Sequence, residues 1–442
     1  MSPRKMHFIT FMRAGPTNHN NGGWRHPDGD GHLVLDPGRY EKIAQISEEG
    51  LFDGIFLVDY QFMQGHVEGS ENMNLKHGGS MVMLDPLQLA ACMARATRHI
   101  GVTATFSTTF YNPYHIARAF ASLDHISSGR AGWNIVTSGN PAEAKNFGMD
   151  SLPQRGDRYD FADQVLEAAM VLWNTWDADA LKFDKQSGLF ADTAKVHYVK
   201  YEGSLVRTEG GLTTPQPPQG HPVLMQAGSS DRGRVFAARW AEVIFTVQQK
   251  KALMQDFYSD MKARVRGAGR DPAHCAILPA IDVIVGETEE QALAEADFVD
   301  SLASVELGLQ TLTGLTGVNL LKIPRQTPLA DVRVEPERTA SIGLLQNVLN
   351  IRKDGRGLTI GEAAQLYATT WMSPRLVGTP VSIADQLQDL FESKVCDGFV
   401  IATSTMPMGL RNFVKLIVPE LQRRGLYRTE YAGSTFRENL RS

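Results

Sequence analysis

The stretch SGRAGWNIVTSGNP (residues 128–141) has a glycine-rich start, a short apolar run and a cluster of Asn, Thr, Ser and Gly. A phosphate-binding loop carries its glycines between a strand and the helix that follows it. Here Gly129 and Gly132 precede the apolar run, where they allow a tight turn into a strand. We therefore interpret the stretch as a buried strand over 132–138, with Asn134, Thr137 and Ser138 at its polar end.

Seven other apolar runs repeat this pattern along the chain. Most are continuous rather than alternating, which is typical of strands buried on both faces. A helical pattern follows each run, and Asp36-Pro37 and Asp85-Pro86 are helix-start signals. The other predicted strands are 6–12, 54–60, 101–110, 222–228, 242–248, 277–286 and 398–404. The predicted helices are 36–50, 85–99, 113–127, 157–173, 230–241, 251–267, 288–303 and 407–424.

Eight strand–helix units predict an α/β fold in which parallel strands close into a (β/α)8 TIM barrel. The alternative, an open doubly wound sheet that binds a dinucleotide, would show G-x-G-x-x-G after its first strand. The chain instead reads RAGPTNHNNGGWRHPDGDGHL there (13–33). We expect one barrel domain over 1–442 with insertions near 13–35, 60–84, 174–220 and 304–380. The insertions are interpreted as lids, family-specific decoration or subunit contacts, and 174–220 reads as a hairpin.

Composition narrows the functional class. The net charge of −5 argues against a general nucleic-acid binder. Cys92, Cys275 and Cys396 lie far apart, so a disulfide framework and a thiolate metal site are not expected. His and carboxylate residues show no metal-binding spacing. No apolar run reaches membrane-spanning length, and we expect a cytoplasmic protein without a membrane partner.

Polar residues gather where the predicted strands end, and active sites of TIM barrels form at that rim. Hydroxyls and amides there suit a large polar cofactor, although strand ends are also polar because they meet solvent. The rim residues are Asp59, Thr105, Ser107, Asn134, Thr137, Ser138, Gln226, Gly228, Ser229, Ser230, Gln248, Thr403 and Ser404.

Two helix starts are candidate anion sites. In QAGSSDRGRVFAARWAE (226–242), Ser229 and Ser230 open a helix after a glycine, which describes either an anion site or plain capping. The negative charge of Asp231 would disfavour a bound anion there, unless its side chain points away from the helix start. In LPQRGDRYDFADQVLEAA (152–169), Arg155 and Tyr159 share a helical face that could bind phosphate; the alternative is a set of surface charges.

Taken together, these motifs resemble the bacterial-luciferase-like FMN-dependent monooxygenases, in the nitrilotriacetate and dibenzothiophene-sulfone monooxygenase branch. The likeness spans nearly the whole chain, and its motifs occur in the family's order. They are NNGGWRHP (20–27), LFDGIFLVD (51–59), TFSTTFYNPYHIARAFASLDHIS (105–127), SGRAGWNIVTS (128–138), NFG (146–148), QAGSSDRGRVFAARWAE (226–242) and VPELQRRGLYRTEYAGSTFRENL (418–440).

The resemblance implies a two-component monooxygenase. FMN would bind at the barrel rim as FMNH2, delivered by a separate NAD(P)H:flavin reductase, and O2 would form a flavin C4a-(hydro)peroxide. Implied substrates are nitrogen- or sulfur-containing aromatics, heterocycles or aminopolycarboxylates, and the implied assembly is a homodimer or homotetramer. The alternatives are an FMN-binding accessory or sensor protein of this fold without oxygenase activity, and a barrel hydrolase without flavin.

The resemblance also implies site residues. Flavin-binding positions fall on Asp59, Thr105, Asn134, Tyr159 and Ser230, with Ser229 beside the last. Arg155 stands where many members carry His, and His19, His26, His66 and His77 are candidates to replace that His. His26 and Asn134 are the catalytic candidates. Phe8, Phe56, Phe106 and Trp133 are interpreted as walls of a dry flavin pocket or as barrel core.

Overall fold

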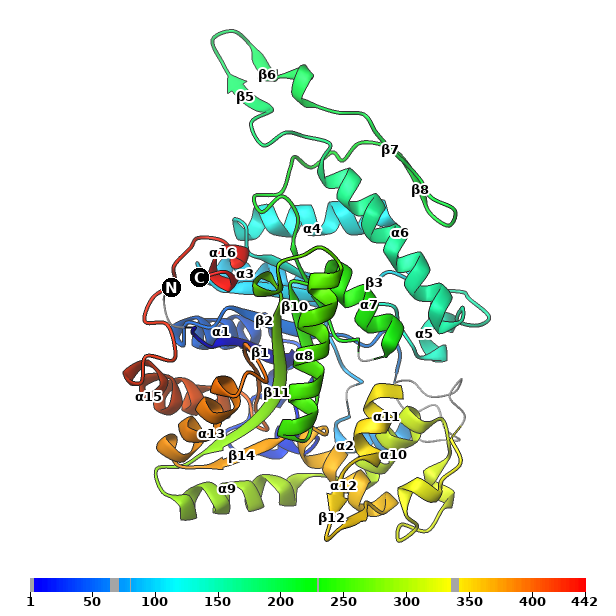
Figure 1. Cartoon of the computed structure of the whole chain (residues 1–442), viewed down its shortest axis with the longest axis vertical. Helices are drawn as coiled ribbons and strands as arrows, with labels where there is room; N and C mark the ends of the chain where they lie inside the picture. Colours follow the sequence, from blue (N-terminus) through cyan, green and yellow to red (C-terminus); the bar gives the residue numbers. More distant parts are fainter. Residues whose placement is uncertain (1–3, 64–70, 80, 229, 335–341) are drawn as a thin grey trace.

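The computed structural model describes residues 4–63, 71–79, 81–228, 230–334 and 342–442. Eight parallel strands close on themselves, because the last of them pairs with the first through His7 and Gly398. The predicted α/β barrel is confirmed, and its helices surround the strands (Figure 1). In chain order the barrel strands are β1 (His7–Arg13), β2 (Gly54–Val58), β3 (Gly101–Ser107), β4 (Ala131–Val136), β9 (Val223–Gln226), β10 (Val243–Thr246), β11 (Ala276–Val285) and β15 (Gly398–Ala402).

The predicted helices form with bounds close to those expected. Asp36 and Asp85 cap them as predicted: Asp36 accepts from the amide of Gly38, and Asp85 accepts from those of Leu87 and Gln88. These helices are α1 (Pro37–Glu49), α3 (Pro86–Ala96), α4 (Pro113–Ser127), α6 (Arg155–Trp173), α7 (Asp231–Trp240), α8 (Lys251–Gly267) and α9 (Glu289–Leu302). The expected helix over 407–424 is interrupted by a π-helical turn, Phe413–Ile417, between α14 (Met408–Asn412) and α15 (Val418–Arg423).

The insertion near 304–380 contains a strand that the sequence did not predict. Its strand, β14 (Arg375–Gly378), pairs in parallel with the far end of β11 and makes the sheet nine-stranded. Four residues, three of them partly exposed, are too short a run to stand out by pattern. The insertion and its exit also hold α10 (Val305–Thr316), α11 (Ile342–Leu349), the pair β12 (Arg352–Lys353) and β13 (Arg356–Gly357), α12 (Ile360–Thr370) and α13 (Pro380–Glu392).

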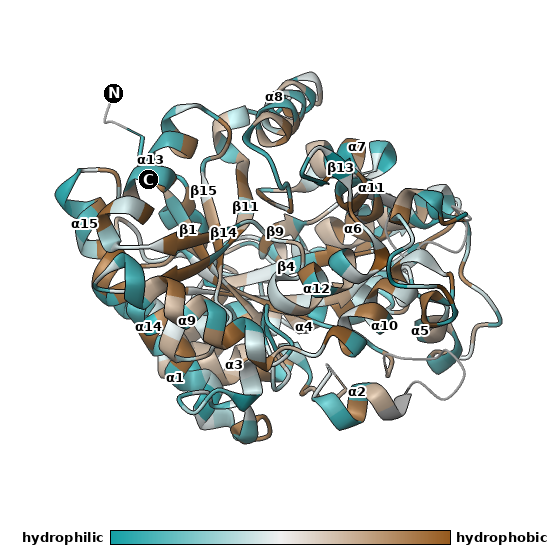
Figure 2. Cartoon of the chain, turned by 90° about the horizontal axis from the view of Figure 1, so that it is seen from below, coloured by the Kyte–Doolittle hydropathy of each residue, from teal (hydrophilic) through white to brown (hydrophobic). Residues whose placement is uncertain are grey.

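The other insertions are built differently. Segment 174–220 forms two hairpins rather than one, β5 (Leu181–Asp184) with β6 (Leu189–Ala191) and β7 (Val199–Glu202) with β8 (Arg207–Gly210), which project from the body (Figure 1). The described part of 60–84 contains α2 (Glu71–His77), and α5 (Pro141–Asn146) follows β4. Figure 2 shows mainly hydrophobic colour on the central strands, whereas the helices around them carry both hydrophobic and hydrophilic colour.

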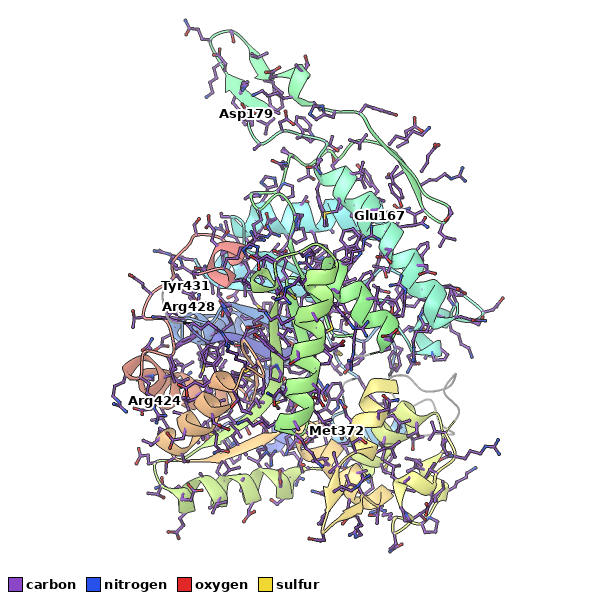
Figure 3. The ribbon with its side chains drawn as sticks, viewed as in Figure 1. Glu167, Asp179, Met372, Arg424, Arg428 and Tyr431 are labelled. Carbon is purple, nitrogen blue, oxygen red and sulfur yellow. The ribbon has the colours of Figure 1, made fainter. Side chains whose placement is uncertain are left out.

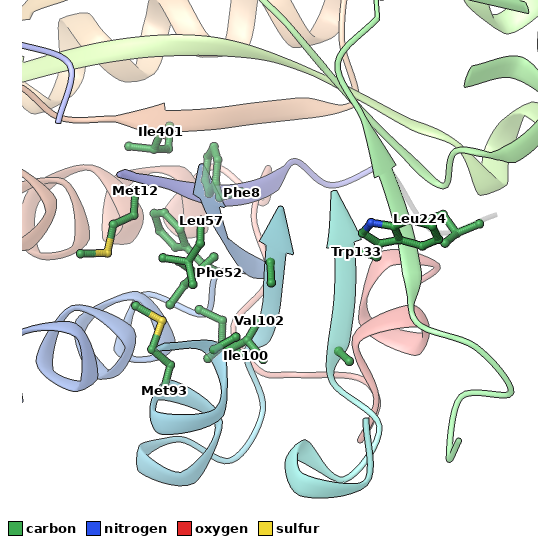
Figure 4. Close-up of a cluster of buried hydrophobic side chains, with 14 of the residues drawn as sticks. Phe8, Met12, Phe52, Leu57, Met93, Ile100, Val102, Trp133, Leu224 and Ile401 are labelled. Carbon is green, nitrogen blue, oxygen red and sulfur yellow. The ribbon is translucent and has the colours of Figure 1, made fainter. Parts of the chain in front are cut away.

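Alternation along the strands divides the core into an inner and an outer layer. Ile9, Phe11 and Phe56 face the barrel interior. Phe8 and Trp133 pack in the outer layer between strands and helices (Figure 4), as does Phe106. Of the four predicted wall residues, therefore, only Phe56 faces the interior. The other three belong to the core outside the barrel.

The bottom of the barrel is closed by the C-terminal segment. The ring of Phe436, the first residue of α16 (Phe436–Leu440), lies beneath three neighbouring strands that each begin with or contain a glycine. A Cβ added to Gly54 or Gly132 would lie 2.9 or 3.1 Å from this ring, and one added to Gly101 would overlap it. The three glycines therefore leave the space that the ring fills.

Candidate active site at the carboxyl ends of the strands

The first half of the site is polar and lies on β3 and β4. Because Gly101 and Gly132 face Phe436 inside the barrel, Thr105 and Asn134 face inward as well. Thr105 donates its hydroxyl to the carbonyl of Leu57 at 2.7 Å and accepts from Asn134 Nδ2 at 2.9 Å. Among the described residues, the buried Oδ1 of Asn134 has no hydrogen-bond partner. Such an atom fits a ligand that donates a hydrogen bond.

The second part of the site is the start of α7. Ser230 caps this helix by accepting from the amide of Gly233 at 3.2 Å. The Tyr159 hydroxyl is in hydrogen-bonding contact with Ser230 and Thr137, and burial raises the pKa of Tyr159. A Cβ on Gly233 would lie 2.8 Å from the Tyr159 oxygen and 3.0 Å from Ser230 Oγ, and one on Gly228 would lie 3.0 Å from that Tyr159 oxygen. The glycines thus keep open a small space lined by hydroxyls.

The side chain of Asp231 does not oppose an anion at this helix start. Its carboxylate turns outward and pairs with Arg264 of α8 at 2.8 Å, with 83% of the side chain exposed. Ser229, the other predicted hydroxyl, lies outside the described residues.

Two arginines lie near Tyr159. Helix α6 begins at Arg155 and includes Tyr159, so the two residues share a helical face as predicted. Arg158, which the alternative interpretation counted among the surface charges, is instead buried and donates from Nη1 to the carbonyl of Pro153 at 2.6 Å. Within the described chain, its buried Nε has no hydrogen-bond partner. Burial lowers the pKa of Arg158, and the charge of Arg155 lowers it further.

Asp59 follows the carboxyl end of β2, as predicted. Burial raises its pKa to about 7, and the nearby carboxylates of Asp85 and Glu143 add to the shift. Glu143 is itself buried at the start of α5, where it receives the amide of Gln61 at 3.5 Å. Near neutral pH, Asp59 can therefore donate or accept a hydrogen bond at the rim.

Another part of the barrel interior is aromatic. Phe11, Phe56 and Phe245 pack together on β1, β2 and β10, with ring centroids 5.5–6.0 Å apart. Trp371, at the end of α12, lies 6.5 Å from Phe11. Arg13, the last residue of β1, places its guanidinium 3.6 Å from the centre of the Trp371 ring.

The predicted histidines separate in space. His19 is 1% exposed, contacts Ser373 Oγ at 2.8 Å through Nε2 and packs edge-on against Phe11. Burial lowers its pKa well below the usual value, so the ring is neutral. His26 contacts Glu295 at 3.2 Å and Phe298, both on α9.

His26 contacts Glu295, Phe298 and the amide of Asp28, whereas Asn134, the other predicted catalytic residue, bonds Thr105. His77 ends α2, and its carbonyl accepts from Trp24. His66 lies outside the described residues. His19 could not be distinguished from the other loop histidines by sequence, because its burial depends on contacts with Phe11 and Ser373.

The hydrogen-bond donors and acceptors of this site match those of FMN. FMN has a flat ring with amide edges and a terminal phosphate, and Asn134 Oδ1, Arg158 Nε and Gln226 Oε1 are buried polar atoms that lack hydrogen-bond partners in the described structure. Within the described ranges, no group of three or more His, Cys, Asp or Glu side chains is arranged to hold a metal ion. None of the helices described is both long and apolar enough to span a membrane.

Fold and rim together define a barrel enzyme with a site for a flavin-like cofactor. The model of the luciferase-like monooxygenase family matches residues 6–397. Dibenzothiophene-sulfone monooxygenase of Rhodococcus erythropolis (strain XP) is 41% identical over 439 residues, covering 99% of this chain and 96% of the relative. Nitrilotriacetate monooxygenase component A of Aminobacter aminovorans is 39% identical over 426 residues, covering 95% and 93%.

A solved structure of riboflavin lyase with modified FMN and riboflavin has a TM-score of 0.88 at 32% identity, covering 99% of this chain and 96% of that one. The chain belongs to the luciferase-like monooxygenase family. The predicted family, its barrel fold, the monooxygenase class and FMN as cofactor are thereby confirmed. The comparisons favour an enzyme over an accessory or sensor protein.

Proposed function

We propose that this chain is the oxygenase component of a two-component system that oxygenates a small organic substrate. A separate NAD(P)H:flavin reductase would supply FMNH2, and reduced FMN supplies the electrons that activate O2. The observation that carries the proposal is the buried, unpartnered Oδ1 of Asn134 in the described rim, held in place by Thr105. Relatives that act on dibenzothiophene sulfone and nitrilotriacetate support a nitrogen- or sulfur-containing aromatic, a heterocycle or an aminopolycarboxylate as substrate.

We assign the cofactor's phosphate to the start of α7. Ser230 and Tyr159 would donate hydroxyls, and Arg155 and Arg158 would supply positive charge. Ser229 remains a prediction at the same helix start.

The polar residues that face the barrel interior would bind the flavin ring. Asn134 Oδ1 would accept a hydrogen bond from the ring, Thr105 would hold that amide in position, and Asp59 would address the ring or the ribityl chain. Phe11, Phe56 and Phe245 inside the barrel would exclude water from the reacting atoms. His26 remains a catalytic prediction, although its contacts are with α9.

The phosphate assignment is tested by titrating FMN and FMNH2 into wild-type protein and into the Ser230→Ala/Tyr159→Phe double variant. We expect the variant to bind both forms at least about tenfold more weakly, since each lost charge-assisted bond costs about 1.5–3 kcal/mol. The control is Ser122→Ala, because this exposed hydroxyl on α4 bonds its own helix. Equal FMN affinity in the double variant would refute the assignment.

The oxygenase activity is tested with an added flavin reductase, NADH and O2, by searching for oxygenated products of candidate substrates by mass spectrometry. Turnover that requires both reductase and O2 would support the proposal. Firm FMN binding without consumption of any candidate would favour the accessory or sensor alternative. Failure to bind FMN in either redox state would refute both.

We further propose a single barrel domain that assembles as a homodimer or homotetramer in the cytoplasm. The projecting hairpins support assembly because they expose large apolar side chains that a monomer leaves in water: Phe183, Leu189, Phe190 and Tyr198. Three unpaired cysteines are consistent with a reducing compartment. Light scattering during gel filtration would report the mass, and a monomer would refute the assembly.

A further inference from the structure

Gln226 ends β9 with a buried side chain whose hydrogen-bond acceptor is unused. The residue is 4% exposed. Among the residues that the structure describes, its Oε1 has no hydrogen-bond partner. Burying an amide oxygen without a donor costs free energy, because water would otherwise have bonded it. A ligand that donates a hydrogen bond would therefore be favoured beside this atom.

The side chain lies on the outer face of β9, away from the barrel interior. Met225 packs in the inner layer and Leu224 in the outer layer, so Gln226 alternates outward. A Cβ added to Gly228 would overlap Gln226 Nε2 and would lie 3.0 Å from Gln226 Oε1. The same Cβ would lie 3.0 Å from the Tyr159 oxygen. The amide therefore packs against Gly228, beside the space assigned to the phosphate.

The strand register places Gln226 between the two ends of the proposed flavin site. Asn134 of β4 pairs with Met225, so Gln226 lies one residue further toward the carboxyl ends of the strands. The chain then passes through Gly228 to Ser230, which caps α7. A ligand with its ring at Asn134 and its phosphate at the start of α7 must therefore pass Gln226 with the chain that joins them.

Three parts of FMN could donate a hydrogen bond: the ring, the ribityl chain and a protonated phosphate. The ring is assigned to Thr105 and Asn134, which face the interior, on the other side of the sheet from Gln226. An ionised phosphate only accepts hydrogen bonds, so an amide oxygen beside it would be repelled. A ribityl hydroxyl both donates and accepts, and it therefore matches either edge of the amide.

We propose that Gln226 binds a hydroxyl of the ribityl chain, so that the protein recognises the linker of its cofactor as well as the ring and the phosphate. This inference rests on the proposed function and adds one residue to its cofactor site. Gly228 is part of the same arrangement, because a side chain at that position would displace the amide.

The test is a fluorescence titration with three oxidised flavins: FMN, riboflavin and lumiflavin, whose ring carries a methyl group in place of the ribityl chain. The wild type should bind riboflavin more tightly than lumiflavin. Gln226→Met keeps the length of the side chain and removes the amide. It should weaken FMN and riboflavin by the same factor, about fivefold, because both carry the ribityl chain, and leave lumiflavin within about twofold.

Thermal unfolding of the ligand-free protein separates this role from a structural one. Because Gln226 Oε1 has no partner in the described structure, Gln226→Met removes no hydrogen bond from that oxygen. Replacing an unpartnered buried polar group by an apolar one of similar size should leave the unfolding temperature unchanged or raise it. A lowered unfolding temperature would show that the amide supports the fold, and would overturn the inference.

Gly228→Ala tests the same contact from the backbone. Its methyl group displaces the amide and also crowds Tyr159. Riboflavin should therefore weaken as it does in Gln226→Met, and FMN should weaken further. The matched control is Gln386→Met on α13, an exposed amide that bonds the carbonyl of Ser382 in its own helix. This control should bind all three flavins as the wild type does.

Four binding results would also overturn the inference: equal affinity of the wild type for riboflavin and lumiflavin, unchanged riboflavin binding in Gln226→Met, a loss confined to FMN, or an equal loss for lumiflavin. The third result would place the amide at the phosphate, and the fourth would place it at the ring. With normal FMN binding by the wild type, each result overturns this inference alone. Absent FMN binding in either redox state would overturn the proposed function as well.

Discussion

Asp53 and Asp59 flank the same strand, β2, and their carboxyl groups have opposite pKa shifts. At the amino end, Arg428 Nη2 lies 2.5 Å from Asp53 and His7 Nδ1 lies 3.1 Å away. Burial alone would raise the pKa of Asp53, but these two partners and the amide of Phe8 together lower it. At the carboxyl end, burial and neighbouring carboxylates raise the pKa of Asp59 to about 7. One carboxyl group therefore supports the structure, and the other can exchange a proton at the rim.

The raised pKa of Asp59 predicts a loss of stability with rising pH. The folded protein binds this proton more tightly than the unfolded chain, where Asp titrates near about 3.9. The stabilisation is therefore complete below that pH and is lost as pH rises through about 7. Urea unfolding of the wild type and of Asp59→Asn should show the wild type weakening relative to the variant by up to about 1.4 kcal/mol per pH unit in this window. Parallel pH profiles would contradict the shift.

The lowered pKa of Asp53 predicts the opposite pH dependence. Its contribution is present above about pH 3.9 and is lost as pH falls through the folded pKa. Arg428, beside Tyr431 in the C-terminal segment (Figure 3), provides the test. Arg428→Leu should cost about 3–5 kcal/mol of unfolding free energy at pH 7, since it leaves a buried carboxylate without its cation.

Adding Asp53→Asn to Arg428→Leu should recover part of that loss, because the buried charge disappears. The same urea unfolding experiment at pH 7 measures it. If Asp53→Asn lowered the stability of Arg428→Leu by as much as it lowers that of the wild type, the two residues would not interact.

Gly101→Ala should displace Phe436 from the bottom of the barrel, because the added methyl group overlaps the ring. Phe436→Ala leaves a cavity there and should cost about 3–5 kcal/mol. Gly267→Ala is the control, since nothing lies within 4 Å of its added Cβ. Thermal unfolding measures all three variants. If Gly101→Ala behaved like the control, the ring would not depend on this space.

Arg158→Gln should weaken FMN binding by about tenfold and leave riboflavin binding unchanged, because riboflavin lacks the phosphate. The exposed Arg266 on α8 offers the matched control, and Arg266→Gln should bind both ligands as the wild type does. Fluorescence quenching of the two flavins measures the affinities. An equal loss of affinity for both flavins would show that Arg158 does not bind the phosphate.

Local patterns were enough to predict the barrel. Continuous apolar runs mark strands covered on both faces, and Asp-Pro pairs such as Asp85-Pro86 mark where helices begin. The shared helical face of Arg155 and Tyr159 was also predictable, because their spacing is local. Strand β14 was missed because its four residues carry too little pattern.

Contacts between distant residues could not be predicted. Nothing near Arg13 in the chain indicates Trp371, and nothing near Gly101 indicates Phe436, since both pairs form only when the fold brings the segments together. Alternation also assigns a side chain to a face without saying which face is inner, so Phe8 and Phe56 looked equivalent by sequence. His19 and His26 were not distinguished either, because the burial of His19 depends on contacts with Phe11 and Ser373.

The position of Phe436 in the chain bears on how the protein is made. During synthesis the strands emerge in order, and β1 lacks one of its two neighbours until β15 has left the ribosome. Even then the bottom of the barrel beneath β2, β3 and β4 stays open until α16 brings Phe436 into place. The nascent chain thus exposes apolar surface until α16 arrives, the condition under which chaperones engage unfinished proteins.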